Sequence, residues 1–470
     1  MKILDESLLD LAHRHAVDFL SALPERHVGP RATRTELLAA LDTPLPDEGE
    51  DPKAVLDTLA GQAERGVIAT AGPRYFGFVI GGAMPVTVAA EWLLNAWDQN
   101  PGLFATSPLV SVAEEVTSGW ILDLFGLPPS GSVGFVTGCQ MANFTCLAAA
   151  RNAVLRGAGW NVEERGLNGA PRVNIVVSAE SHVTIHTSLR MLGFGTQSMI
   201  AVATDGQGRM IADELARVVE NLAGPTIICA QAGNVNSGAV DPLRRIAEIA
   251  HERDAWLHID GAFGLWAAAS ADRKHLVDGV ELADSWATDA HKWLNVPQDS
   301  GLAITRHSSA HRSAMSVRAE YLELTAGAER DPFEYTPEFS RRARGIPVYA
   351  ALRTLGRRGV EAMIDRCCAR ARQFASLLSK NPRVKILNDV VLNQVLVRFA
   401  DDDATTREVV ARVQRDGTCW LGGTTWHGVA AMRISVSNWA TSEEDVERSV
   451  AAIGVASGLG SLGVASGNST

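Results

Sequence analysis

The stretch Ser285–Leu294, with the sequence SWATDAHKWL, places a lysine directly after a histidine at the end of a short apolar run. A lysine amine that is partly removed from water has a lowered pKa and can form a Schiff base with a carbonyl group. A lysine at a strand end can equally extend its charged head into solvent, which is the more common arrangement. The neighbouring sequence decides between these two interpretations.

Similar apolar runs alternate with helical stretches from about Val133 to Ile304. The runs are VGFV, VNIVVS, MIAVAT, TIICAQA, AWLHID, SWATDA and GLAIT. Runs rich in valine and isoleucine that alternate with helices are typical of a mostly parallel α/β sheet. Because ligands of such sheets bind at the carboxyl ends of the strands, we expect the chemistry of this protein there.

A second motif, WLHIDGAFG, ends an apolar strand with Asp260 and then small residues. A carboxylate in this position can hold a proton on a pyridine nitrogen and so keep the ring electron-poor. Ala262 is small enough for a flat ring to lie against it. A helix cap or a metal ligand are the alternatives, but no second carboxylate or histidine stands at metal-site spacing, so we expect no metal.

Two earlier strand ends also carry polar residues. Gly138, Cys139 and Gln140 form a turn before a helix, whose free N–H groups can bind phosphate, although an ordinary strand-to-helix connection has the same pattern. Neither a P-loop nor a dinucleotide fingerprint is present. His182 follows the next strand, where an imidazole can stack on an aromatic cofactor, transfer a proton or serve structure alone.

Composition and charge exclude several classes of protein. A chain of 470 residues predicts two or three domains. Its formal net charge of -11 disfavours nucleic acid and anionic membranes as partners. The six cysteines are too few for a disulfide scaffold, and no segment has the length and apolarity of a membrane span. We therefore expect a soluble, cytoplasmic protein.

Together these motifs resemble the pyridoxal-phosphate-dependent group II amino acid decarboxylases, the family of aromatic amino acid, glutamate, histidine and diaminobutyrate decarboxylases. The resemblance runs from about Pro73 to Ile453. The segments that carry it are Pro73–Phe78, Gly233–Asp241, His258–Ala262, Ala283–Trp293 and Arg433–Asn438. It implies the α/β architecture of fold type I, with a mostly parallel seven-stranded sheet in a large domain and a small C-terminal α+β domain.

The resemblance also divides the chain. We expect an N-terminal helical arm over residues 1–95, a large cofactor-binding domain over 96–345, a small domain over 346–456 and a flexible tail over 457–470. It implies a homodimer with the active site at the interface, and arm helices that wrap the partner.

Roles follow position by position from the resemblance. Lys292 would form the internal aldimine with pyridoxal 5'-phosphate, Asp260 would hold the pyridine nitrogen, and His182 and Ala262 would pack on the two faces of the ring. The residues that would hold the phosphate are Gly138, Cys139, Gln140 and His291. Asn236 would lie near a cofactor oxygen or the substrate carboxylate, and Tyr75, Phe76 and Phe78 would contribute to the substrate pocket.

The reaction implied is decarboxylation of an L-amino acid to the amine and CO2, and the aromatic residues of the pocket segment favour an aromatic substrate. Tyr335 is our candidate for the proton donor, with a packed loop tyrosine as the alternative. Without such a donor, the alternatives are oxidative deamination that follows decarboxylation and an aldehyde-lyase reaction of the sphingosine-phosphate type. An aminotransferase reaction and a catalytically silent relative also stay open.

Overall fold

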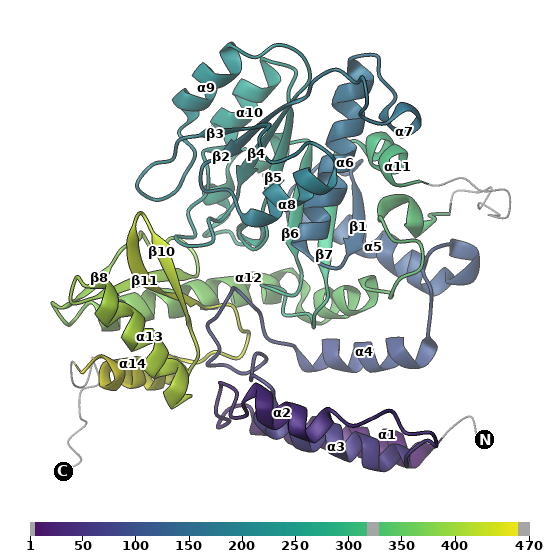
Figure 1. The fold of residues 1–470 in the computed structure, drawn as a ribbon. Helices are drawn as coiled ribbons and strands as arrows, with labels where there is room; N and C mark the ends of the chain where they lie inside the picture. The colour runs from purple at the N-terminus through teal and green to yellow at the C-terminus, as the bar shows by residue number, and fades with distance from the viewer. Residues whose placement is uncertain (1–4, 317–328, 459–470) are drawn as a thin grey trace.

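A seven-stranded sheet lies at the centre of the computed structural model, which describes residues 5–316 and 329–458 (Figure 1). Its strands are β1 Ser132–Val136, β2 Asn174–Ser178, β3 Met199–Val202, β4 Thr226–Gln231, β5 Trp256–Asp260, β6 Ser285–Asp289 and β7 Gly301–Thr305. Their order is β1-β7-β6-β5-β4-β2-β3, and only β7 runs antiparallel to its neighbours. The predicted mostly parallel α/β sheet is confirmed.

Helices cover both faces of this sheet. Because successive residues of a strand point to opposite faces, the apolar side chains on both faces need a helical layer to bury them. In β2, Ile175 and Val177 pack with one helical layer, whereas Val176 belongs to the core beneath the other. The first layer contains α6 Cys139–Gly157, α8 Val183–Met191 and α11 Ser308–Met315. The second contains α5 Pro108–Leu124, α9 Ala212–Glu220, α10 Leu243–His251 and part of α12 Gly345–Leu378.

A smaller antiparallel sheet follows, with the order β10-β11-β9-β8. Its elements are β8 Val384–Ile386, β9 Gln394–Phe399, β10 Gly422–Trp426 and β11 Val429–Ser435, with α13 Asp403–Asp416 and α14 Glu443–Ser457 against it. The sequence shapes α14 locally: Ser442 and Asp445 form a capping box at its start, and Gly458 ends it in the left-handed region. Short helices elsewhere are α7 Val162–Arg165, η1 Phe104–Thr106, η2 Gly264–Ala269, η3 Lys274–Val277, η4 Val280–Leu282 and η5 Pro332–Tyr335.

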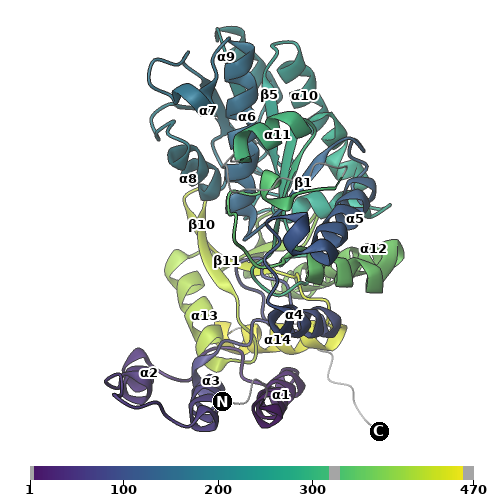
Figure 2. The same ribbon diagram turned by 90° about the vertical axis from the view of Figure 1, so that its right-hand side faces the viewer.

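The N-terminal helices lie together beside the rest of the molecule (Figures 1 and 2). They are α1 Glu6–Ala22, α2 Arg34–Leu41 and α3 Pro52–Gly66, and α4 Pro85–Trp97 follows them. None of the residues in α1, α2 or α3 is buried. Large apolar side chains are exposed along this part of the chain, among them Leu9, Leu41, Leu59, Trp92 and Trp97.

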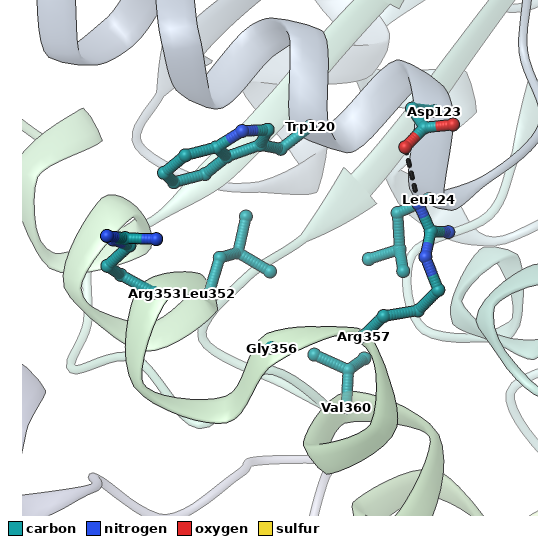
Figure 3. A pocket seen from close by; sticks show the side chains of 8 residues that line it. All are labelled: Trp120, Asp123, Leu124, Leu352, Arg353, Gly356, Arg357 and Val360. Carbon is teal, nitrogen blue, oxygen red and sulfur yellow. Dashed lines mark hydrogen bonds and ion pairs between the residues drawn. The ribbon is translucent and has the colours of Figure 1, made fainter.

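Helix α12 joins the two sheets and is interrupted at Gly356, whose φ of 60° lies in the left-handed region that favours glycine. A surface cavity of about 240 Å³ opens at this interruption (Figure 3). Trp120, Leu352 and Val360 line it, and Arg357 forms an ion pair with Asp123 at its edge.

The predicted divisions of the chain at residues 95, 345 and 456 stay predictions. Most of the predicted tail, residues 459–470, lies outside the described residues. Within those residues, no helix combines the length and apolarity that a membrane crossing needs, and no group of three or more His, Cys, Asp or Glu side chains is arranged to hold a metal ion.

Candidate active site

Lys292 lies in the turn that follows β6, and its Nζ atom is 2.8 Å from Oδ2 of Asp289. The lysine side chain is 18% exposed and that of the aspartate 2%. Burial is the largest influence on the pKa of Lys292 and lowers it, but nearby negative charges, that of Asp289 first and that of Asp260 among the others, together outweigh burial and the pKa is raised. A lysine that only lost its contact with water would have a lowered pKa, and the acidic neighbours of Lys292 reverse that direction.

Asp289 also connects the lysine to the start of α6. Its Oδ1 atom accepts a hydrogen bond of 2.6 Å from the backbone N–H of Cys139 and lies 3.5 Å from Nε2 of His291. The two ends of one carboxylate thus hold the lysine and the helix start that we predicted to bind phosphate. We assigned no role to Asp289 from the sequence, although its place in the motif SWATDAHKWL was visible.

Asp260 ends the neighbouring strand β5 and is buried. Its Oδ1 atom accepts hydrogen bonds from the backbone N–H of Ala262 at 3.2 Å and from Sγ of Cys139 at 3.4 Å, and Oδ2 accepts one from Nδ2 of Asn143 at 3.4 Å. Within the described residues it forms no ion pair. A buried carboxylate that receives only neutral donors fits a cationic group of a ligand, such as a protonated pyridine nitrogen.

His182 stands at the start of α8, beside the end of β2. Its Nδ1 atom accepts the backbone N–H of Thr184 at 3.4 Å and lies 2.8 Å from the Thr184 hydroxyl. Burial lowers the pKa of His182, and the charge of Asp260 opposes this shift. The imidazole close to Asp260 therefore favours its uncharged form. Its stacking on a cofactor stays a prediction.

The predicted phosphate turn has no side-chain cap, so the first N–H groups of α6 are not all used inside the protein. Gly138 approaches His291, since a Cβ atom on this glycine would lie 3.3 Å from Cε1 of the imidazole. The backbone N–H of Ser300 donates to Nδ1 of His291 at 3.3 Å, while the buried Ser300 hydroxyl has no partner within the described residues. Gln140 is exposed at this turn. These groups offer an anion several donors at once.

Gly81, three residues after the segment predicted to line the substrate pocket, contacts the backbone at Lys292. The N–H of Gly81 donates to the backbone oxygen of His291 at 3.2 Å, and a Cβ atom at Gly81 would lie 1.8 Å from the backbone oxygen of Lys292. Only glycine allows this close approach.

The aromatic residues of this segment separate into two groups. Tyr75 and Phe78 both stack on Trp420, at ring distances of 5.2 and 5.6 Å, and Phe78 is 63% exposed. Phe76 packs in the core against Phe374 at 5.0 Å. Phe76 is therefore packed in the core of the chain, and its contribution to a substrate pocket stays a prediction.

Strand β11 of the second sheet contributes Arg433, to which we assigned no role from the sequence. Its Nη1 atom donates to the backbone oxygen of Val235 at 3.3 Å, and it forms no ion pair within the described residues. Burial lowers the pKa of Arg433, and its charge lies close enough to His182 to lower the pKa of that histidine. Asn236, predicted near the cofactor, accepts a hydrogen bond of 3.1 Å from the hydroxyl of Thr424.

Glu180 links the β10–β11 hairpin to the large sheet, two residues before His182. Its carboxylate lies 2.7 Å from Nε2 of His427 and accepts hydrogen bonds from Trp426 at 3.1 Å and Asn234 at 3.0 Å. In Figure 2 the tip of this hairpin accordingly lies beside α8.

Tyr335 lies in η5, apart from these residues. Its ring packs 4.1 Å from the guanidinium of Arg330 and 5.4 Å from the ring of His311. No hydrogen bond or ring contact joins it to Lys292 or Asp260 within the described residues. The proton-donor role of Tyr335 stays a prediction.

Known proteins are similar to this chain in sequence and in fold. A family model described as the pyridoxal-dependent decarboxylase conserved domain matches residues 35–400. The aromatic-L-amino-acid decarboxylase of Bacillus atrophaeus is 26% identical over 406 residues, covering 85% of this chain and 82% of the relative. The acidic amino acid decarboxylase of Homo sapiens is 28% identical over 360 residues, covering 75% and 68%. The crystal structure described as Oryza sativa TDC with PLP and tryptamine has a TM-score of 0.91 and 22% identity over 98% of this chain and 99% of that one, which shows a common fold.

Proposed function

Because this chain belongs to the pyridoxal-dependent decarboxylase family, we propose that it acts on an L-amino acid with an aromatic side chain. The enzyme is a pyridoxal-phosphate-dependent carboxy-lyase with the fold type I architecture. The assignment of the site rests on the positions of two residues at adjacent parallel strands. Asp260 ends β5, and Lys292 follows the end of β6.

The residues at these strand ends fit the cofactor. Asp260 offers a buried carboxylate that has no cationic partner among the described residues, and Lys292 offers an amine. The start of α6 with Ser300 and His291 offers donors to a phosphate. Pyridoxal phosphate, when bound, supplies an electron-poor ring that accepts the electrons released as CO2 leaves. Asp260 would keep a proton on the ring nitrogen, and His182 would cover one face of the ring.

Arg433 supports recognition of an amino acid substrate. Its side chain is half-buried near His182 and lacks an acidic partner in the described part of the chain, so a substrate carboxylate would supply the missing charge. The aromatic group formed by Tyr75, Phe78 and Trp420 supports a flat apolar side chain on the substrate.

The decisive experiment is a substrate panel of aromatic and acidic L-amino acids, assayed for CO2, amine and aldehyde. We expect CO2 and amine in equal amounts from aromatic substrates, and none from Lys292→Ala. Preference for an acidic substrate would refute the aromatic assignment while leaving the family assignment intact. Aldehyde in place of amine would indicate oxidative deamination after decarboxylation.

We also propose a cytoplasmic homodimer. All six cysteines are free and buried, which supports a reducing compartment. The arm helices α1–α3 bury no residue of their own and expose Leu9, Leu41 and Leu59, which supports a second subunit as their partner. Removal of residues 1–66 should yield monomers in sedimentation experiments, and an unchanged dimer would contradict the role of the arm.

A further inference from the structure

We propose that Asn143 and His258 are positioning residues that orient the carboxylate of Asp260 through a directional chain of hydrogen bonds. This proposal rests on the proposed function, in which Asp260 meets the ring nitrogen of the cofactor. Asp260 itself is a member of the recognised site, but the chain behind it extends through three further side chains to Trp256.

The chain lies between β5 and α6. Alternate residues of a strand point to the same face, so Trp256, His258 and Asp260 all face α6. Ser285 stands opposite His258 in the register of β5 and β6, and Asn143 lies one turn after Cys139 on the helix. All of these side chains are buried, so water does not compete for their hydrogen bonds.

Trp256 stands at the donor end of the chain, because an indole N–H can only donate. Its Nε1 atom donates to Oγ of Ser285 at 2.9 Å. The serine hydroxyl is then free to donate to Nδ1 of His258, also at 2.9 Å. Burial lowers the pKa of His258 to about 4, so the ring is neutral and carries one proton. That proton lies on Nε2, because the carboxylate of Asp260 at the other end of the chain can only accept hydrogen bonds.

That Nε2 proton points to Oδ1 of Asn143 at 2.9 Å, which leaves the amide nitrogen to donate to Oδ2 of Asp260 at 3.4 Å. With the amide turned over, Oδ1 would face the carboxylate, and two acceptors would meet without a proton between them. Asp260 is therefore the acceptor at the end of the chain. Cys139 and the N–H of Ala262 hold its other oxygen, so the chain fixes the orientation of the carboxylate.

The test measures cofactor binding in Asn143→Ala, His258→Phe and the double variant. We expect each single variant to release pyridoxal phosphate about tenfold faster than the wild type, and the pH titration of the visible absorbance of bound cofactor to shift. Because both residues act through one chain, the double variant should release the cofactor no faster than the single variant that has the larger effect. Asn152→Ala is the matched control: it lies on the same helix, is buried, and bonds to Glu163 instead.

Asn143→Leu, which keeps the branched shape of the side chain, is measured in parallel, and thermal unfolding without cofactor confirms that each variant folds. Wild-type release rates and absorbance titration in a folded Asn143 variant would overturn the proposal, as would additive effects in the double variant. A wild-type protein without visible absorbance after loading would overturn the proposed function instead, so the two failures are distinct.

Discussion

The amine of Lys292 and the carboxylate of Asp289 form an ion pair of 2.8 Å at the end of β6, so the lysine has a counter-ion from its own motif. A protonated amine cannot attack a carbonyl group. The ion pair therefore sets the pH at which the protein chain can take up its cofactor.

Asp289→Asn should lower the pKa of Lys292, because the carboxylate that raises it is gone. Cofactor loading of the wild-type protein should speed up as pH rises and the amine loses its proton, and in the variant this rise should occur at lower pH. Stopped-flow absorbance during loading measures it. Identical pH profiles for the two proteins would contradict the role of Asp289.

Asp260→Ala should reduce turnover far more than it reduces the amount of bound cofactor. Removal of a preorganised charge of this kind typically costs a factor of about 10²–10³ in kcat. Turnover and cofactor content are measured on the same sample, with Asp278→Ala, an exposed aspartate bound to Arg244, as the control. Turnover near the wild-type level would exclude Asp260 from the mechanism.

Arg433→Met should raise KM for the substrate about tenfold or more and leave cofactor binding nearly unchanged, because a charge-assisted hydrogen bond to the substrate carboxylate is lost. Arg407→Met, at an exposed position of α13, serves as the control. If Arg433 acts on the cofactor instead, the release rate of the cofactor will change and KM will not.

Tyr335→Phe tests the proton donor. If the phenol protonates the product carbon, amine release should fall about 100-fold, since general acids contribute factors of this order. The ring contacts with Arg330 and His311 are retained in phenylalanine, so the fold should be unaffected. Amine release at the normal rate would remove Tyr335 from the mechanism.

Acid should destabilise the protein through two buried histidines. Burial lowers the pKa of His258 to about 4 and that of His311 to about 3. Between pH 6.5 and these values the unfolded chain binds protons that the folded chain does not, so the free energy of unfolding should fall by about 1 kcal/mol per pH unit for each histidine. Denaturant titrations of wild type and His311→Gln measure it, with exposed His251→Gln as the control. A slope that His311→Gln leaves unchanged would contradict this assignment.

Much of the fold follows from the sequence because each strand of the large sheet is a short apolar run with helices on both sides. Lys292, Asp260 and His182 were found by the same reasoning, since their positions after strands place them at one edge of the sheet. Their immediate surroundings depend on how elements dock, which a single sequence does not specify.

Asn143 and His258 illustrate the difference. They are 115 residues apart and meet only because α6 packs across β5. Arg433 likewise reaches the site from the second sheet. Phe76 is buried and Phe78 is exposed, and the backbone between them leaves the extended region, with a positive φ at Phe78. Contacts of this kind require the tertiary structure.

The burial of all six thiols makes their alkylation rates a measure of local unfolding. Burial raises the pKa of Cys146, Cys367 and Cys419 to about 12, so almost no thiolate exists in the folded chain at neutral pH. An alkylating reagent can then modify a cysteine only while the surrounding segment is transiently open. Since the cysteines lie on α6, β4, α12 and the segment before β10, their separate labelling rates would rank the local stability of these parts of the molecule.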